Sequence, residues 1–430
     1  MLSYARTFRG FDRDVRLYFG VAALLGASVF GGITVVLQNL YLLRIGYGPE
    51  AVGAVNAASQ IALAAFSLPA AILGRRFGSR NMLLLAIALL ALGNACLPLA
   101  EAFAEPSRLV WLLAAAAIAN VGIALLLVND KAFVMGVTTA EQRNHVYSML
   151  GAAWPLAAFV GGLIAGILPF VFAKSLGVGP GEPAPYRYAL LVSAGLAAAG
   201  FVVMTRTRGP SAEVGGARAT ASGRAPIGLI LAMSLVVFAQ AAGESSVRTF
   251  FNVYLDQGLG VATPTIGALA ALAALVGAFA ALSMPFFARR LGRPRTYVLG
   301  SVAVVASMLP LALVADLRAA GLGYVGVVAF TSLARPCNIV FQLELVRQEW
   351  RGLMAGATTL AFGVSAALVS LLGGYLIAGT GYSALFLACG LVTLVGVAWF
   401  WAYFRTPRGE YVAPRGSLED SRGQAVVEES

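Results

Sequence analysis

The sequence predicts an all-α membrane protein with twelve transmembrane helices in two pseudo-symmetric six-helix bundles. Three observations predict this fold. Hydrophobic residues make up 59% of the 430 residues and charged residues only 11%, whereas soluble domains carry about 25% charge. Apolar blocks long enough to cross a hydrocarbon core of roughly 30 Å recur along the chain. The two halves of the chain also repeat each other's loops.

Each crossing needs about 20 apolar residues, and twelve blocks meet this length. Helices are expected because lipid cannot satisfy exposed backbone groups, and the alternating pattern of barrel strands is absent. We expect the spans at residues 17–43, 51–73, 82–100, 109–130, 146–172, 187–204, 227–255, 264–288, 296–315, 320–346, 353–378 and 382–404.

The blocks divide the chain into two bundles, residues 1–204 and 226–404. Residues 205–225 are rich in Gly, Ala, Ser and Arg and predict a flexible linker, while residues 405–430 have few apolar residues and predict a disordered tail. The basic N-terminus also fits a cleavable signal peptide. The apolar run that follows is too long for one, and the start of the second half repeats it.

Basic residues gather at alternate loops, as in "GRRFGSR" and "ARRLGRPR", which by the positive-inside rule places both termini in the cytoplasm. The net charge of +11 is therefore spread over loops, and no nucleic-acid partner is expected. The Ala-, Gly- and Arg-rich composition suggests a bacterial inner membrane. No zinc-binding spacing, nucleophile motif or phosphate-binding loop occurs, so we expect no cofactor, no metal and no enzyme activity.

Three pairs of segments repeat between the halves. "LQNLYLLRIGYGPEAVGA" matches "FFNVYLDQGLGVATPTIGA" and pairs Asn39 with Asn252 at an offset of 213 residues. The two basic loops pair Arg76 with Arg290 at an offset of 214, and "AEQRNH" matches "RQEWRG" at 208. Parallel repeats of this kind are one architecture of membrane transporters.

Six plus six spans, a basic linker and a loop of the form Gly-x-x-x-Asp-Arg-x-Gly-Arg-Arg in each half resemble the major facilitator superfamily. The resemblance covers nearly the whole chain and implies secondary transport. It assigns the loop residues to a cytoplasmic gate, although Arg75 and Arg289 stand where the family has its aspartate. The acidic role would then pass to Asp130 and Glu344, and the gate residues are Arg76, Gly78, Asp130, Arg290, Gly292 and Glu344. Arg76 or Arg80 is the expected partner of Asp130.

Ionisable residues inside the seventh and tenth spans indicate a functional site, because such groups are costly in lipid. Glu244 lies near mid-membrane, and Arg248 follows one helical turn later on the same face. They can form a structural ion pair or belong to a transport path. Arg335 precedes Pro336 at a similar depth, and Asn338 and Gln342 extend a polar stripe along its helix. In the resembled fold the first and fourth segments of each half line the path, so these charges would meet.

The first half offers neutral candidates for the opposite wall. Asn39 repeats as Asn252, so an architectural role is equally open for it. Packing between helices is as plausible as ligand binding for each of the others: Gln38, Asn56, Gln60, Asn120 and Trp154.

The resulting hypothesis is a secondary transporter of a small organic solute, coupled to protons through Glu244. In this hypothesis Arg335, Arg248, Asn338, Gln342, Gln38, Asn39, Gln60 and Trp154 bind the substrate. Protonation of Glu244 would release Arg335 for an anionic or hydrogen-bonding group. A lipid or amphiphile translocase, a drug exporter, a uniporter with a permanently paired Glu244 and a non-transporting receptor are the alternatives. The drug exporter is weakened because Ala157 and Ala158 interrupt its Gly-Pro-x-x-Gly-Gly signature. The expected partners are the solute, protons and membrane lipids, and we expect a monomer.

Overall fold

The computed structural model describes residues 11–209 and 225–405, apart from the side chains of Ala140, Glu141, Asn144, Ser148 and Gln348. Within these ranges the chain is almost entirely helical, and twelve helices are long and apolar enough to cross a membrane. This confirms the predicted fold class and the number of spans. Most of the predicted linker and nearly all of the predicted tail lie outside the described residues.

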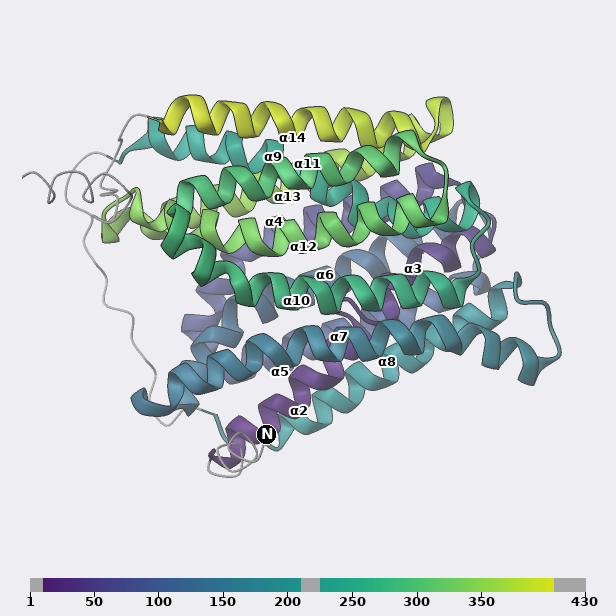
Figure 1. Cartoon of the computed structure of the whole chain (residues 1–430). Helices are drawn as coiled ribbons and strands as arrows, with labels where there is room; N and C mark the ends of the chain where they lie inside the picture. Colours follow the sequence, from purple (N-terminus) through teal and green to yellow (C-terminus); the bar gives the residue numbers. More distant parts are fainter. Residues whose placement is uncertain (1–10, 210–224, 406–430) are drawn as a thin grey trace, which may run out of the picture.

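The helices lie side by side in two groups (Figure 1). The first half contains α2 (Arg13–Ser28), α3 (Ile33–Arg44), α4 (Pro49–Phe77), α5 (Ser79–Cys96), the 3₁₀ segment η1 (Leu97–Ala102), α6 (Ser107–Val137), α7 (Ala140–Leu176) and α8 (Pro183–Thr205). The second half contains α9 (Ile227–Val253), the π-helical η2 (Tyr254–Gly258), α10 (Thr263–Leu291), α11 (Arg293–Leu313), α12 (Leu317–Glu344), the 3₁₀ segment η3 (Gln348–Trp350), α13 (Arg351–Thr380) and α14 (Tyr382–Phe404).

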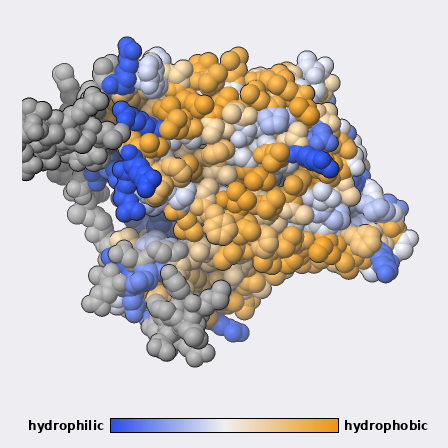
Figure 2. Space-filling model, in the orientation of Figure 1, coloured by the Kyte–Doolittle hydropathy of each residue, from blue (hydrophilic) through white to orange (hydrophobic). Residues whose placement is uncertain are grey.

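The molecule has two ends, a linker end and a distal end. The linker end carries Thr205 and Ile227, where the linker leaves and enters the bundles, and lies at the left of Figure 1. The distal end is the opposite one and carries Arg44 and Asp256. Apolar side chains cover the middle of the helices, and hydrophilic ones gather towards both ends (Figure 2). This belt is the surface that lipid tails require.

The first span is interrupted between α2 and α3, which the run of apolar residues did not indicate. Gly31 has a φ of 87°, and a Cβ on Gly32 would lie 1.8 Å from the backbone oxygen of Ala27, so both positions require glycine. Buried hydroxyls satisfy the broken backbone: Ser193 donates to the Ser28 carbonyl at 3.2 Å and contacts Thr34 at 2.7 Å. Such a break is tolerated at membrane depth only when protein encloses it.

The two halves meet along α4 with α13 and along α7 with α10. Glycines allow the backbones to touch, as small residues do between helices in membranes. A Cβ on Gly53 would lie 2.2 Å from the Ser370 carbonyl oxygen, and one on Gly374 would lie 2.5 Å from that of Pro49. Both contacts lie towards the distal end, where α4 begins and α13 ends.

The buried apolar residues form clusters that differ at the two ends. At the distal end, one cluster joins both halves and includes Leu40 and Val52 with Phe250 and Ile266. Towards the linker end, one cluster contains only first-half residues and another only second-half residues. The described part of the chain is therefore packed as one body distally and as two bodies near the linker.

Replacing Gly53 by Val should separate the halves at the distal end, because the new side chain would overlap the α13 backbone. Spin labels on Ser175→Cys and Thr380→Cys, at the distal ends of α7 and α13, would report a longer distance by pulsed electron resonance. Gly195→Val is the matched control, because nothing lies within 4 Å of a Cβ there. An unchanged distance in Gly53→Val would contradict this account of the interface.

Candidate functional site

An open pocket of about 110 Å³ lies between α9, α12 and α13. Its lining is polar for a site inside a membrane bundle: Gln240, Glu244, Arg335, Asn338, Gln342, Thr358 and Thr359, with Val237, Ala241, Ile339 and Phe362 as the apolar members. All of these residues belong to the second half. The structure thus brings Glu244, Arg335, Asn338 and Gln342 together as the sequence suggested.

Glu244 is the acidic residue of this pocket, and it is 8% exposed. Its Oε1 atom accepts from Arg248 Nη1 at 3.2 Å and from Arg335 Nη1 at 3.1 Å. The pair within α9 that the sequence predicted is therefore present, together with a second partner from α12. One carboxylate oxygen serves two guanidinium groups, so the cluster carries an excess of one positive charge when all three are ionised.

The two arginines are far more accessible than the carboxylate. The side chains of Arg335 and Arg248 are 45% and 61% exposed, against 10% for that of Glu244. The Arg335 guanidinium also lies over the Phe362 ring, 4.5 Å from its centroid, which fixes its plane by a cation–π contact. In the pocket, which Arg335 lines and Arg248 does not, an incoming solute would meet the Arg335 guanidinium before the carboxylate.

A network of hydrogen-bonded amides lines the same pocket beside the charged cluster. Gln240 Oε1 accepts from Asn338 at 3.2 Å and from the Tyr297 hydroxyl at 3.0 Å. Thr358 donates to Gln342 Oε1 at 3.0 Å. Sequence reasoning missed Gln240, although a polar residue one turn before Glu244 on the same helix was a usable signal. It also missed Thr358 and Phe362, because the predicted span at residues 353–378 contains no charged residue to mark it.

The neutral residues predicted for the opposite wall do not line this pocket. Gln60 lies where α4 packs closely against α13. A Cβ added to Gly363 of α13 would be 3.7 Å from the Gln60 backbone oxygen. Trp154 packs edge-on against Phe30, with centroids 5.0 Å apart. Asn120 donates to the Ala116 carbonyl within its own helix. Gln38 is partly buried on α3. These positions lie within the first half or at its contact with the second.

Asn39 and Asn252, paired by the repeat, make reciprocal bonds between the halves. Asn39 donates to the Thr249 carbonyl at 2.7 Å, and Asn252 donates to the carbonyls of Val35 and Val36 at 3.1 and 3.3 Å. Asn56 in turn donates to Asn39 Oδ1 at 2.9 Å. The structure therefore supports the architectural alternative for Asn39, because both asparagines hold α3 against α9.

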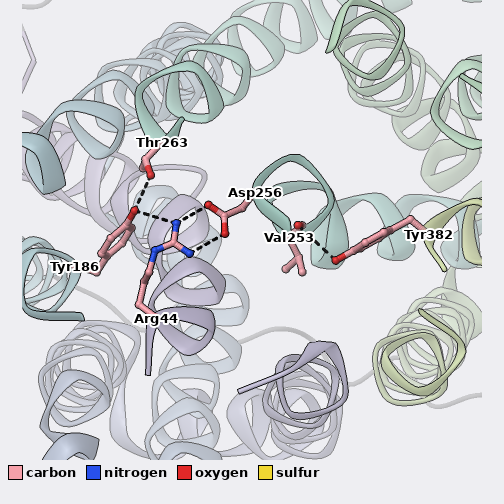
Figure 3. A network of polar contacts seen from close by, with 6 residues as sticks. All are labelled: Arg44, Tyr186, Val253, Asp256, Thr263 and Tyr382. Atoms are coloured by element: carbon pink, nitrogen blue, oxygen red, sulfur yellow. Dashed lines mark hydrogen bonds and ion pairs between the residues drawn. The ribbon is translucent and has the colours of Figure 1, made fainter. Parts of the chain in front are cut away.

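The ion pair between Arg44 and Asp256 joins the two halves at the distal end (Figure 3). Arg44 donates to both oxygens of Asp256, at 2.8 and 2.5 Å, and to the Tyr186 hydroxyl at 3.4 Å. Tyr186 and Thr263 join the halves a second time through hydroxyls 2.7 Å apart. Nearby, outside the spans, burial and a hydrogen bond to Glu105 raise the pKa of Tyr47 to about 12.

At the linker end the predicted gate residues have other partners than expected. Asp130 accepts from the backbone N–H of Lys131 at 2.6 Å, while Arg80 donates to the carbonyls of Thr207 and Thr205. Neither expected partner, Arg76 or Arg80, forms an ion pair with Asp130 among the described residues. Glu344 pairs with Arg293 inside the second half.

The repeated loops at the linker end have matching geometry in both halves. Gly78 and Gly292 have φ values of 82° and 78°, and each ends one helix and precedes the next. Arg76 lies over the Phe77 ring and Arg290 over the Phe286 ring, at 5.3 and 4.3 Å. A left-handed backbone favours glycine, which explains why the motif keeps this residue in both halves.

No group of three or more His, Cys, Asp or Glu side chains that could hold a metal ion occurs among the described residues. A membrane-embedded pair of repeated bundles with a charged pocket defines a class, the transporters built from parallel repeats. The chain belongs to the Major Facilitator Superfamily, whose model matches residues 19–359 and 233–423. No curated protein matches the chain.

Solved structures with the same fold include three transporters. The xylose transporter XylE from E. coli, inward open, has a TM-score of 0.70 at 16% identity, covering 95% of this chain and 99% of that one. A mutant of the nucleoside transporter NupG gives 0.69 at 13%, covering 91% and 100%. A bacterial homologue of the human lysosomal transporter Spinster, inward-facing and occupied, gives 0.68 at 12%, covering 91% and 96%. At these identities the likeness concerns the fold alone.

Removing one partner of the Arg44–Asp256 pair should destabilise the protein, because the remaining charge is largely buried. We expect Asp256→Asn to lower the free energy of unfolding by about 3 kcal/mol, and the double variant with Arg44→Gln to recover part of this loss. Denaturation by SDS in mixed micelles measures both.

The matched control is Glu101→Gln, which removes the more exposed Arg187–Glu101 pair within the first half. It should cost less than about 1 kcal/mol. If Asp256→Asn and Glu101→Gln lower the free energy of unfolding equally, the ion pair between the halves stabilises the protein no more than the exposed pair does.

Proposed function

We propose that this protein is a proton-linked secondary transporter that moves a small polar solute by alternating access, with Glu244 carrying the proton. The observation behind the proposal is the shared Oε1 atom of Glu244, which two arginines from different helices contact at 3.2 and 3.1 Å. A purely structural pair would need one arginine. A second guanidinium makes the carboxylate an exchangeable partner.

Coupling of solute to proton follows if the solute and the Glu244 carboxylate compete for the same guanidinium groups. While Glu244 is ionised, it holds the Nη1 atoms of both arginines. Protonation removes the charge that attracts them, and Arg335 then turns its free donors to the solute. Binding of solute and proton thus favour each other, which is a coupling free energy between two sites. This argues against a uniporter with a permanently paired carboxylate.

The packing of the halves supports alternating access. The shared cluster, the Asn39 and Asn252 bonds and the Arg44–Asp256 pair close the distal end, while separate clusters divide the halves near the linker. With the linker end in the cytoplasm of a bacterial inner membrane, as the arginine distribution predicts, this conformation faces inward. The outward conformation would break the distal contacts and join the linker ends, where Asp130 and Glu344 could then exchange partners.

The lining of the pocket favours a small polar solute over an amphiphile. Gln240, Asn338, Gln342 and Thr358 offer amides and hydroxyls, and the apolar lining consists of Val237, Ala241, Ile339 and the Phe362 ring that Arg335 covers. A lipid tail or an apolar drug would need a wider apolar surface. We therefore place the amphiphile translocase and the drug exporter second, and we propose that a monomer contains the complete path.

Glu244→Gln should retain solute binding and lose proton-driven accumulation, because the amide can accept a hydrogen bond but cannot carry a proton. A thermal-shift screen of sugars, organic acids, amino acids and amphiphiles would first identify a bound solute by a rise in melting temperature. The same solute should not raise the melting temperature of Arg335→Ala. Uptake into proteoliposomes with an imposed pH gradient then measures accumulation, which should fall at least tenfold in Glu244→Gln.

Glu182→Gln is the matched control, because Glu182 is an exposed carboxylate in the distal loop before α8. It should transport like the unmodified protein. Undiminished uphill uptake by Glu244→Gln would remove Glu244 from the proposed role.

A further inference from the structure

We infer that the solute is a hydroxylated organic monoanion, and that one solute and one proton cross together with no net charge moved. This inference rests on the proposed function, since it takes Glu244 as the proton carrier. It goes further by naming the charge and chemistry of the solute. The argument uses the charge of the cluster, its accessibility and the acceptors around it.

The charge count of the cluster singles out a monoanion. Glu244 with Arg248 and Arg335 carries one positive charge in excess when the site is empty and ionised. Protonation raises the excess to two, and a bound monoanion returns it to one. Empty and loaded sites then present the same charge at mid-membrane, where each uncompensated charge is costly. A neutral solute would leave two excess charges, and a dianion would leave none.

The geometry allows one anionic group to replace the carboxylate of Glu244. Both Nη1 atoms lie within 3.2 Å of a single oxygen, so a carboxylate of the solute can reach both guanidinium groups. Arg335 lines the pocket and its side chain is 45% exposed, so it is accessible to the solute directly. Arg248 is not among the lining residues, but its side chain is 61% exposed and contacts the same oxygen of Glu244, so it is the second guanidinium within reach of that position. The glutamate lies behind them.

The other titratable groups nearby leave this count unchanged at neutral pH. Tyr297 of α11 donates to Gln240, Tyr324 of α12 lies near Arg248, and Cys389 lies on α14 near Ser246. Phenols and thiols are ordinarily neutral at pH 7. The lining of α13 contributes only hydroxyls and the Phe362 ring. The residues of α3 and α4 that the sequence predicted for the opposite wall lie outside the pocket lining and are neutral amides.

A buried acceptor indicates that the solute carries a hydroxyl donor. Asn338 lines the pocket and is 3% exposed, and its Oδ1 atom has no donor among the described residues. An unpaired buried acceptor is costly, so a ligand that supplies a donor there gains affinity. Hydroxy acids and sugar acids combine this donor with a single carboxylate.

The test is uptake of radiolabelled probes by the full chain in proteoliposomes. Lactate, glycerate and gluconate are the monoanions, xylose and uridine the neutral probes, and malate the dianion. At least one monoanion should accumulate when the interior is alkaline. A potassium diffusion potential of either sign, set with valinomycin, should change the initial rate less than about twofold.

Glu244→Gln separates this inference from the proposed function. Its loaded site has the same charge as the native loaded site, so exchange of the monoanion across the membrane should remain within about threefold. Its empty site carries two excess charges, so net uptake should fall to background. Arg335→Lys keeps the charge and should retain more exchange than Arg335→Gln.

Other outcomes overturn one claim or both. Proton-driven uptake of xylose, uridine or malate with none of the monoanions, or uptake that follows the membrane potential, would overturn the monoanion and leave Glu244 as proton carrier. Net uptake of a monoanion that Glu244→Gln does not reduce would overturn the proton carrier itself. If no radiolabelled probe is taken up and none drives proton movement, both the monoanion and the proton carrier are overturned.

Discussion

The sharing of one carboxylate oxygen by two guanidinium groups is the interaction on which the candidate site and its proposed chemistry depend. An ionised residue inside a bilayer must be paired, and Glu244 is paired twice. The second partner comes from α12, so the cluster ties two helices that line one pocket. Its excess positive charge explains why the accessible part of the site is cationic although a carboxylate lies at its centre.

In the proposed transport cycle, packing makes this local cluster part of a larger movement. At the distal end a single apolar core crosses both halves, and Asn39, Asn252 and the Arg44–Asp256 pair reinforce it with polar bonds. Towards the linker each half has its own core. Two separately packed bodies can rotate about the region between these ends without losing their internal packing, because close-packed protein cores resist deformation.

The sequence was sufficient for the helical class, the twelve spans and the meeting of Glu244 with Arg335, because apolar length and the costs of buried charge are properties of residues. The sequence could not predict which groups the neutral polar residues contact. Gln60 and Trp154 are polar or amphipathic in either a cavity or a helix contact, and only the packing of neighbouring helices separates the two. Likewise, Asp130 and Arg80 do not pair with each other but have backbone partners, the Lys131 N–H and the Thr207 carbonyl, and the sequence pattern does not mark such partners.

The repeat explains where symmetry was kept and where it was lost. Asn39 and Asn252 keep the same role in both halves, because each braces the other half's helix. At the offset of 213 residues, Glu244 corresponds to Gly31, which lies in the break between α2 and α3. One copy of the position therefore interrupts a helix, and the other places a charge on a continuous one. Two identical halves would carry either two breaks or two carboxylates, and a pocket with charge on one wall alone requires this divergence.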